Sequence, residues 1–141
     1  MSTFGKAVWS GGLKDGKGAI STKSGALKDY PYGFAARFED GKNGTNPEEL
    51  IGAAHAGCFT MALSNILGQE GLTAEKMETQ ADVTLMKQGE GFAITKVHLT
   101  LTAKIPGADE AKFQDLAAKA KAGCPVSKVL NAEITMEAKL V

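Results

Sequence analysis

One stretch of the sequence decides how the rest is interpreted: residues 46–59, which read NPEELIGAAHAGCF. Asn46 is a residue type that caps helix N-termini, and Pro47 suits the first helical position, where its missing N–H needs no partner. Glu49 follows the cap by three residues, as is common at helix starts. We therefore expect a helix over Glu48–Leu67 that ends at one of the glycines just beyond.

Small residues occupy much of this expected helix: Gly52, Ala53, Ala54, Ala56 and Gly57. Small side chains let neighbouring elements approach closely. We therefore expect the helix to be central and crowded, and to pack on more than one face.

Period-two alternation and turn residues predict strands on both sides of this helix. We expect strands at residues 6–10, 18–22, 34–39, 79–86, 92–105 and 133–141, and a turn at 40–44. Residues 109–122 predict an amphipathic helix with Gly123 as its C-cap, followed by a short helix over 125–131. These patterns indicate a single domain over residues 1–141, of the α+β class, mostly antiparallel, with the helices collected on one side.

The charge of the chain excludes several function classes. The chain has 141 residues, 16 of them Lys or Arg and 16 Asp or Glu, so its formal net charge is zero. We expect no binding to nucleic acid and no attraction to an anionic membrane. No apolar run approaches the roughly 20 residues of a membrane span, and we expect no signal peptide. Two cysteines are too few for a secreted disulfide scaffold, which favours the cytoplasm.

Arg37 is the only arginine among the 16 cationic residues. Lysine offers a flexible point charge, whereas arginine offers a planar, permanently charged fork. A single arginine in a lysine-rich chain therefore points to Arg37 as a candidate functional residue.

The two cysteines are the candidates for chemistry. Cys58 lies inside the expected helix, and Cys124 stands directly before Pro125. Proline at the first position of the short helix would place Cys124 at its N-cap, where free N–H groups favour a thiolate. The alternative is that both thiols are small core hydrophobes, which is common for free cysteine.

Glu48 and Cys58 are ten residues apart, which on a continuous helix is about 15 Å of rise. They can share a site within one chain only if the helix breaks near Gly52 or Gly57. Otherwise Glu48 must reach the Cys58 of a second subunit. Taken alone, Glu48 is also explained as an acid in a first helical turn, where the helix dipole favours it.

The histidines allow further interpretations. His55 precedes Cys58 by three residues on the same helical face, so a Cys/His acyl-transfer enzyme is conceivable, although a packed or hydrogen-bonded histidine is commoner. His98 is expected on the polar, solvated side of its strand. Two His and two Cys match a zinc site in number but not in spacing, so no metal is expected.

Two motifs resemble those of the OsmC/Ohr family, named in part after osmotically inducible protein C. The first comprises residues 32–39 (YGFAARFE) and 44–59 (GTNPEELIGAAHAGCF), and the second is 120–127 (AKAGCPVS). The resemblance covers nearly the whole chain. It implies a thiol-dependent peroxidase that reduces organic hydroperoxides, and less readily hydrogen peroxide, in oxidative and osmotic stress defence.

The resemblance also implies an OsmC-like fold, with antiparallel sheets packed around central helices in an intertwined homodimer and active sites at the subunit interface. By the family pattern, Cys58 is the peroxidatic and Cys124 the resolving cysteine. Arg37 would stabilise the thiolate and the leaving alkoxide, and Glu48 would orient the guanidinium through a bidentate pair.

The implied catalytic cycle needs no cofactor. Cys58 becomes a sulfenic acid, Cys124 condenses with it to a disulfide, and an external dithiol, of lipoyl type rather than thioredoxin, restores both thiols. The small apolar residues Ala53, Ala54, Phe59 and Met61 are candidates for a substrate pocket or simply for the core. The non-enzymatic alternative is a binding or stress-protection module with two buried thiols.

Overall fold

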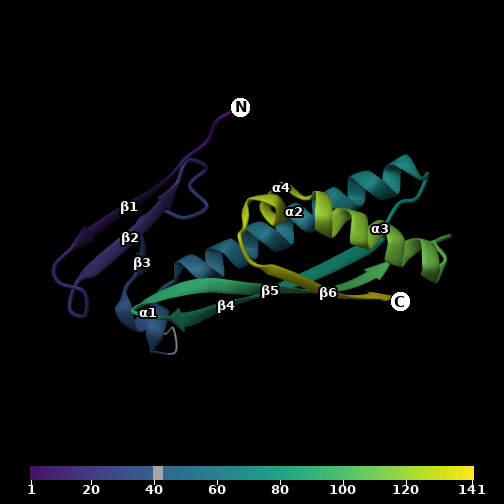
Figure 1. Ribbon diagram of the computed structural model, residues 1–141. Coiled ribbons are helices and arrows are strands. Elements are labelled where there is room, and N and C mark those ends of the chain that lie inside the picture. The colour runs from purple at the N-terminus through teal and green to yellow at the C-terminus, as the bar shows by residue number, and fades with distance from the viewer. Residues whose placement is uncertain (40–42) are drawn as a thin grey trace. The chain divides into compact units, whose positions relative to one another are not determined.

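The computed structural model describes residues 1–39 and 43–141 (Figure 1). Its elements fall into two compact units, Met1–Leu50 and Ile51–Val141, and each is described here by itself. The first three residues of the turn expected at 40–44 lie outside the described residues.

The first unit begins with a three-stranded antiparallel sheet in the order β1-β2-β3. It comprises β1 (Gly5–Ser10), β2 (Lys17–Thr22) and β3 (Tyr30–Tyr32), so the strands expected at 6–10 and 18–22 are confirmed. Gly18 lies beneath the rings of Trp9 and Tyr32, where a Cβ atom would come within 2.7 Å of both. Glycine at this position lets the two rings pack edge to face, 5.5 Å between centroids.

The strand expected at residues 34–39 was wrong, because this segment forms the helix α1 (Phe34–Phe38). Its apolar residues Phe34, Ala36 and Phe38 fit a period of two, which suggested a strand. The two phenylalanines also stand four residues apart, and on a helix this brings their rings to 5.0 Å between centroids. In a strand the same residues would be about 13 Å apart and this contact would be lost.

The long helix α2 (Pro47–Gln69) begins as expected. The Asn46 side chain accepts a hydrogen bond from the Glu49 N–H at 2.8 Å, which confirms the cap. The helix runs two residues further than Leu67, and Gly71 follows with a positive φ of 73°.

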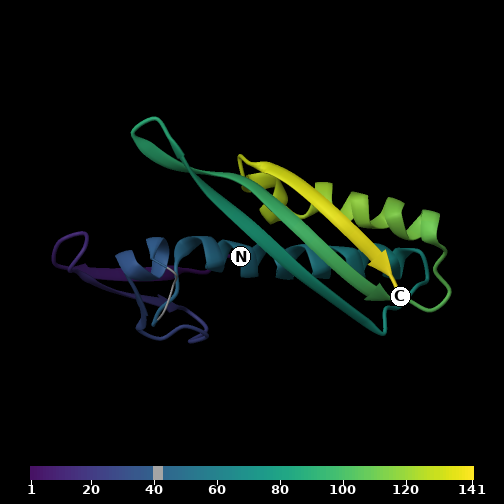
Figure 2. The same cartoon turned by 90° about the horizontal axis from the view of Figure 1, so that it is seen from below.

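The second unit contains a sheet in the order β4-β5-β6, with helices α2 and α3 on one of its faces (Figure 2). The strands are β4 (Lys76–Gln88), β5 (Gly91–Lys104) and β6 (Glu133–Leu140), and the helices between β5 and β6 are α3 (Glu110–Gly123) and α4 (Pro125–Val129). The β4 and β5 strands are antiparallel, whereas β6 lies parallel to β5 after the crossover through α3 and α4. The α+β class, with the helices on one side of the sheet, is as expected. The parallel pairing of β6 with β5 was not predicted from the sequence.

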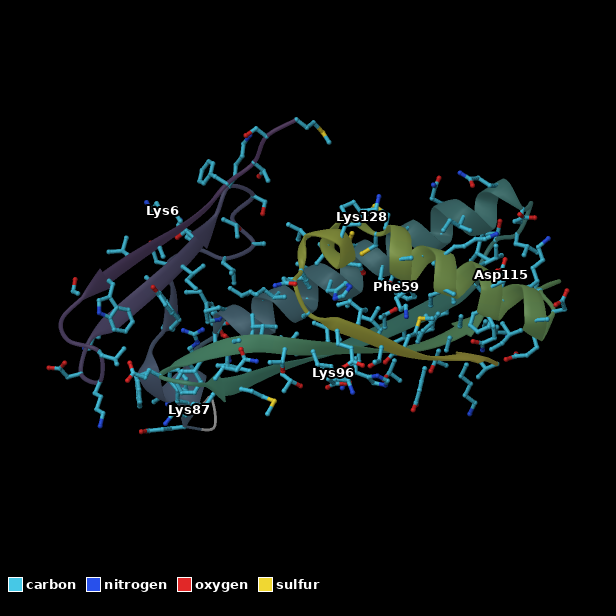
Figure 3. The ribbon with its side chains drawn as sticks, viewed as in Figure 1. Lys6, Phe59, Lys87, Lys96, Asp115 and Lys128 are labelled. Atoms are coloured by element: carbon cyan, nitrogen blue, oxygen red, sulfur yellow. The ribbon has the colours of Figure 1, made fainter. Side chains whose placement is uncertain are left out.

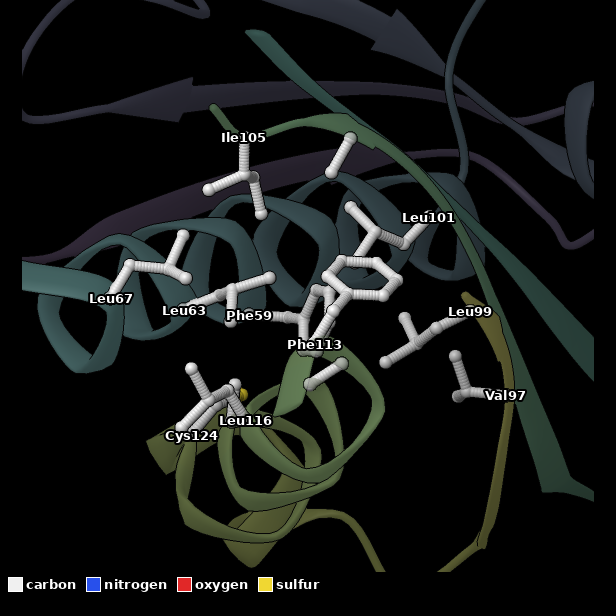
Figure 4. Packing of buried hydrophobic residues seen from close by; sticks show 13 residues of the cluster. Phe59, Leu63, Leu67, Val97, Leu99, Leu101, Ile105, Phe113, Leu116 and Cys124 are labelled. Carbon is white, nitrogen blue, oxygen red and sulfur yellow. The ribbon is translucent and has the colours of Figure 1, made fainter. Parts of the chain in front are cut away.

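Side chains from three elements meet in the core of this unit (Figure 4). Val97, Leu99 and Leu101 on β5 are fully buried, which confirms the alternation expected for that strand. The helices contribute Phe59, Leu63 and Leu67 from α2 and Phe113 and Leu116 from α3. Figure 3 shows Phe59 inside the layer between helices and sheet, with Lys96 on the opposite face of the sheet.

Among the described residues, α2 is the one helix long and apolar enough to cross a membrane, with a mean hydropathy of 1.4. Length and composition alone do not separate such a helix from the core helix of a soluble protein. One side of α2 packs into the core of the second unit, where Phe59, Leu63 and Leu67 are buried with side chains of β5 and α3. The other side of α2 is exposed in the single chain, with Met61 at 76%.

Candidate functional site

The fold brings the two cysteines together. Cys58 extends from α2, Cys124 lies at the junction of α3 and α4, and the two thiols are close enough that each shifts the pKa of the other. Both cysteines carry free thiols. The pair that the sequence identified as candidates for chemistry is therefore one contact pair within the second unit.

Cys124 occupies two helix ends at once. Its N–H donates to the Ala120 carbonyl at 3.0 Å, which ends α3, and its Sγ accepts from the Ser127 N–H at 3.3 Å, which begins α4. The expected N-cap position is thus confirmed. The C-cap of α3 is Cys124 and not Gly123, which is the last residue of the helix.

The surroundings of Cys124 favour its thiolate. Burial by itself raises the pKa of this fully buried thiol. Hydrogen bonds with the Ser127 hydroxyl, the Ser127 N–H, the Cys58 thiol and the Val126 N–H act in the opposite direction and outweigh the burial, so the pKa of Cys124 is lowered.

The surroundings of Cys58 favour its thiol form. Burial has the largest effect and raises its pKa; a hydrogen bond from the Val126 N–H lowers it, and the neighbouring Cys124 thiol raises it by smaller contributions. In the described chain, Cys124 therefore ionises more readily than Cys58. Activation of Cys58 as a nucleophile requires an additional positive charge close to its sulfur.

His55 is fully buried on α2, and its contact is with a serine. Its Nε2 lies 2.7 Å from Ser127 Oγ, which in turn lies 3.4 Å from Cys124 Sγ. The hydrogen bond of His55 Nε2 therefore goes to Ser127 and not to Cys58, its partner in the acyl-transfer interpretation. Desolvation lowers the pKa of His55, which keeps the ring neutral.

Sequence reasoning missed Ser127 as an individual residue, although it ends the second motif. Its position three residues after Cys124 was the available signal, because an N-cap side chain accepts from the N–H of that residue. His98, expected to be solvated, is half-buried and its Nδ1 lies 2.6 Å from Thr135 Oγ1.

Arg37 and Glu48 form a forked ion pair in the first unit. Arg37 Nη2 lies 2.7 Å from Glu48 Oε1, and Arg37 Nε lies 3.2 and 3.3 Å from the two carboxylate oxygens. The Asn46 side chain donates to the Ala36 carbonyl at 3.1 Å, which ties α1 to the start of α2. The expected bidentate pair is therefore present, with the Glu48 carboxylate nearly buried and the Arg37 guanidinium half-exposed.

An apolar pocket of about 200 Å³ lies beside this guanidinium. Among the described residues its walls are Trp9, Leu13, Tyr32, Gly33, Phe34, Phe38 and Pro47, and of its lining residues there only Arg37 is charged. The pocket candidates named from the sequence lie elsewhere: Phe59 is in the core, Ala53 and Ala54 are exposed, and Met61 lines a groove between α2 and the start of β4.

In the described ranges 1–39 and 43–141, no three or more His, Cys, Asp or Glu side chains converge on a possible metal position. The two histidines are engaged separately, His55 with Ser127 and His98 with Thr135. The side chains that do converge are the two thiols, and thiols in contact are suited to redox chemistry.

Comparisons with known proteins agree with this geometry. The family model "OsmC-like protein" matches residues 39–139. Peroxiredoxin OsmC of Escherichia coli is 57% identical over 136 residues, which cover 96% of this chain and 94% of that protein. Organic hydroperoxide resistance protein OhrB of Bacillus subtilis is 30% identical over 123 residues, which cover 87% of this chain and 88% of the relative.

Solved structures show the same fold. The crystal structure of Bacillus subtilis OhrB superposes with a TM-score of 0.71 at 30% identity, covering 96% of this chain and 98% of that one. An organic hydroperoxide resistance protein OsmC from Legionella pneumophila superposes with a TM-score of 0.75 at 28% identity, covering 99% and 97%. The chain belongs to the OsmC-like protein family and has the OsmC/Ohr fold.

Proposed function

We propose that the chain is a cysteine-based peroxidase that reduces organic hydroperoxides in stress defence. The observation that carries this function is the proximity of two free thiols, Cys58 and Cys124, each of which shifts the pKa of the other. The family supports it, since the relatives are named peroxiredoxin and organic hydroperoxide resistance proteins. Free thiols also suit a reducing cytoplasm, where we place the protein.

In the first step, the Cys58 thiolate attacks one oxygen of the hydroperoxide. An S–O bond forms, the O–O bond breaks, and the alkoxide leaves and takes up a proton, so that a sulfenic acid and an alcohol result. Arg37 stabilises the thiolate and the negative charge that develops on the leaving oxygen. Glu48 holds the guanidinium fork in one orientation through its bidentate pair.

Burial raises the pKa of Cys58, and a guanidinium beside the sulfur would reverse that effect. The helix α2 is continuous from Pro47 to Gln69, so Glu48 and Cys58 of one chain are separated by about 15 Å of helix rise. The alternative of a broken helix is thereby removed. We therefore place Glu48 and its partner Arg37 at the Cys58 of a second copy, in a homodimer.

In the second step, Cys124 displaces the hydroxyl of the Cys58 sulfenic acid. The proximity of the two thiols, each of which shifts the pKa of the other, supports this assignment. A small external dithiol of lipoyl type then reduces the disulfide by thiol–disulfide exchange.

The pocket beside Arg37 favours an organic substrate. Aromatic and aliphatic side chains form most of its wall, which suits the alkyl part of a hydroperoxide, while the guanidinium attracts the polar group. Hydrogen peroxide has no apolar part to bury there. We therefore expect organic hydroperoxides to be reduced more efficiently than hydrogen peroxide.

Turnover tests the proposed function directly. With a lipoyl-type dithiol as reductant, the purified protein should consume an alkyl hydroperoxide over many cycles, and thioredoxin should support the reaction less well. If hydroperoxide is not consumed with any dithiol, a binding or stress-protection module is the better interpretation.

The exposed side of α2 is suited to a second copy of the chain. Small residues such as Ala53 and Gly57 allow two helices to approach closely, and Met61 is an adaptable apolar contact. A groove of about 840 Å³ continues this side onto the start of β4. An apolar surface of this kind is rarely left uncovered in solution.

Replacing Met61 with glutamate should convert the dimer to a monomer. Met61 is 76% exposed in the single chain, so the variant should fold, but its carboxylate would be buried without a partner at the subunit contact. Ala118→Glu, on the exposed side of α3, is the matched control and should stay dimeric. Sedimentation of all three proteins measures the effect; a dimeric Met61→Glu variant would exclude this surface.

A further inference from the structure

His55 is an unusual residue for the interior of α2. It is fully buried, and within the described part of the chain its Nδ1 has no hydrogen-bond partner. Leaving a buried polar atom unpaired costs free energy, which an apolar residue of similar size would avoid. Packing alone therefore does not explain a histidine at this position.

The other ring nitrogen of His55, Nε2, is connected through the Ser127 hydroxyl to Cys124, the proposed resolving cysteine. Nε2 lies 2.7 Å from Ser127 Oγ, and Ser127 Oγ lies 3.4 Å from Cys124 Sγ. In one arrangement the Cys124 thiol donates to Ser127, and the Ser127 hydroxyl donates to Nε2. In the reverse arrangement Nε2–H donates to Ser127, whose hydroxyl donates to a Cys124 thiolate. The chain of three groups can therefore serve both protonation states of Cys124.

We propose that Ser127 and His55 form a proton relay that removes the thiol proton of Cys124 when its sulfur attacks the Cys58 sulfenic acid. This inference rests on the proposed function and adds two positioning residues to it. Neither of them reacts with the peroxide; they act through Cys124.

The step balances in atoms and electrons. An electron pair of the Cys124 sulfur forms the S–S bond, and the S–O bond of Cys58 breaks with its pair leaving on hydroxide. The thiol proton moves to Ser127 as the Ser127 hydroxyl proton moves to His55 Nε2. The hydroxide takes up one proton and leaves as water, so one sulfenic acid and one thiol give one disulfide and one water.

The histidine is suited to accept a proton and release it again. Desolvation lowers the pKa of His55, so the ring is neutral at neutral pH and Nε2 can accept when Nδ1 carries the hydrogen. The same desolvation disfavours the imidazolium, so the proton is held only briefly. His55 can therefore pass a proton on, and it does not stay positively charged beside the Cys124 thiolate.

The other titratable groups near Cys124 in the described part of the chain each have an identified position or hydrogen-bond partner. Cys58 faces it from α2, Lys121 of α3 donates to the Ile134 carbonyl, and Lys128 of α4 is exposed. The sheet contributes apolar side chains to the core that includes Cys124, among them Val97, Leu99, Ile134 and Met136. Once Cys58 is oxidised, we therefore assign a pH dependence of the rate of disulfide formation to Cys124 and its relay.

Rapid mixing with one equivalent of an alkyl hydroperoxide tests the relay, because sulfenic acid formation and disulfide formation are followed separately. Ser127→Ala should slow disulfide formation by at least about tenfold at neutral pH, because it removes the hydroxyl that takes up the Cys124 thiol proton. The rate should recover at alkaline pH, where Cys124 ionises without help. Ser127→Thr keeps the hydroxyl and should restore the rate at neutral pH.

His55→Gln should slow the same step, and His98→Gln is the matched control, since His98 bonds Thr135 in the same unit. The relay is overturned if the Ser127→Ala and His55→Gln variants form the disulfide at the wild-type rate. It is also overturned if the rate of disulfide formation in both variants is reduced by the same factor at neutral and at alkaline pH. Wild-type protein that forms sulfenic acid but no disulfide would instead overturn the resolving role of Cys124 and, with it, the relay.

Discussion

Replacing Cys58 with serine should abolish the reduction of organic hydroperoxides, whereas replacing Cys124 with serine should leave a single oxidation per chain. The hydroxyl of serine is a much weaker nucleophile toward peroxide oxygen than a thiolate, so no sulfenic acid can form at position 58. The Cys124→Ser variant still forms the sulfenic acid, but this intermediate has no resolving thiol.

Peroxide consumption in a single turnover, together with trapping of sulfenic acid, measures both variants. The lowered pKa of Cys124 makes the experiment informative, since pKa alone would favour Cys124 as the attacking thiol. If Cys58→Ser retained the oxidation and Cys124→Ser lost it, the two roles would have to be exchanged. Equal residual oxidation in both variants would contradict either assignment.

The second large effect is expected at Arg37. Arg37→Lys keeps the positive charge but cannot make the forked contact in which Nη2 and Nε both reach the Glu48 carboxylate. Loss of an oriented donor to a developing oxyanion lowers rates by about a hundredfold or more, so we expect a loss of this size in kcat/KM.

Two neighbouring acids extend this experiment: Glu48 supplies a second test of the ion pair, and Glu49 supplies the matched control. Glu48→Gln removes the ion pair and should also lower activity, because the guanidinium loses its orientation. Glu49→Gln changes the adjacent side chain, which is exposed, and should leave activity unchanged. Near-normal kcat/KM in Arg37→Lys would show that Arg37 takes no part in the reaction.

Local sequence patterns predicted much of the fold because helix caps and strand alternation depend on residues only a few positions apart. The Asn46 cap and the alternation of Val97, Leu99 and Leu101 each depend on neighbours within a few residues, and both are found in the structure. Residues 34–38 were misassigned because their apolar positions satisfy a strand period and a helix spacing at once. In the structure the helix is supported by the contact between the rings of Phe34 and Phe38 and by the hydrogen bond from the Asn46 side chain to the Ala36 carbonyl.

Features that depend on contacts between residues far apart in the chain could not be predicted from the sequence. The parallel pairing of β6 with β5 requires the crossover through α3 and α4, which no residue in either strand reveals. The sequence likewise named Cys58, Cys124, Arg37 and Glu48 by motif, but not the link from His55 through Ser127, since these two residues are 72 positions apart. Nor could it show that burial raises the pKa of Cys58.

Titration of free thiols before and after a substoichiometric amount of an alkyl hydroperoxide shows whether the two cysteines react as a pair. Each molecule of hydroperoxide should remove two thiols from one chain as a Cys58–Cys124 disulfide, and a dithiol should restore both. If the hydroperoxide left both thiols free, or oxidised Cys58 without consuming Cys124, the two-cysteine mechanism would be contradicted.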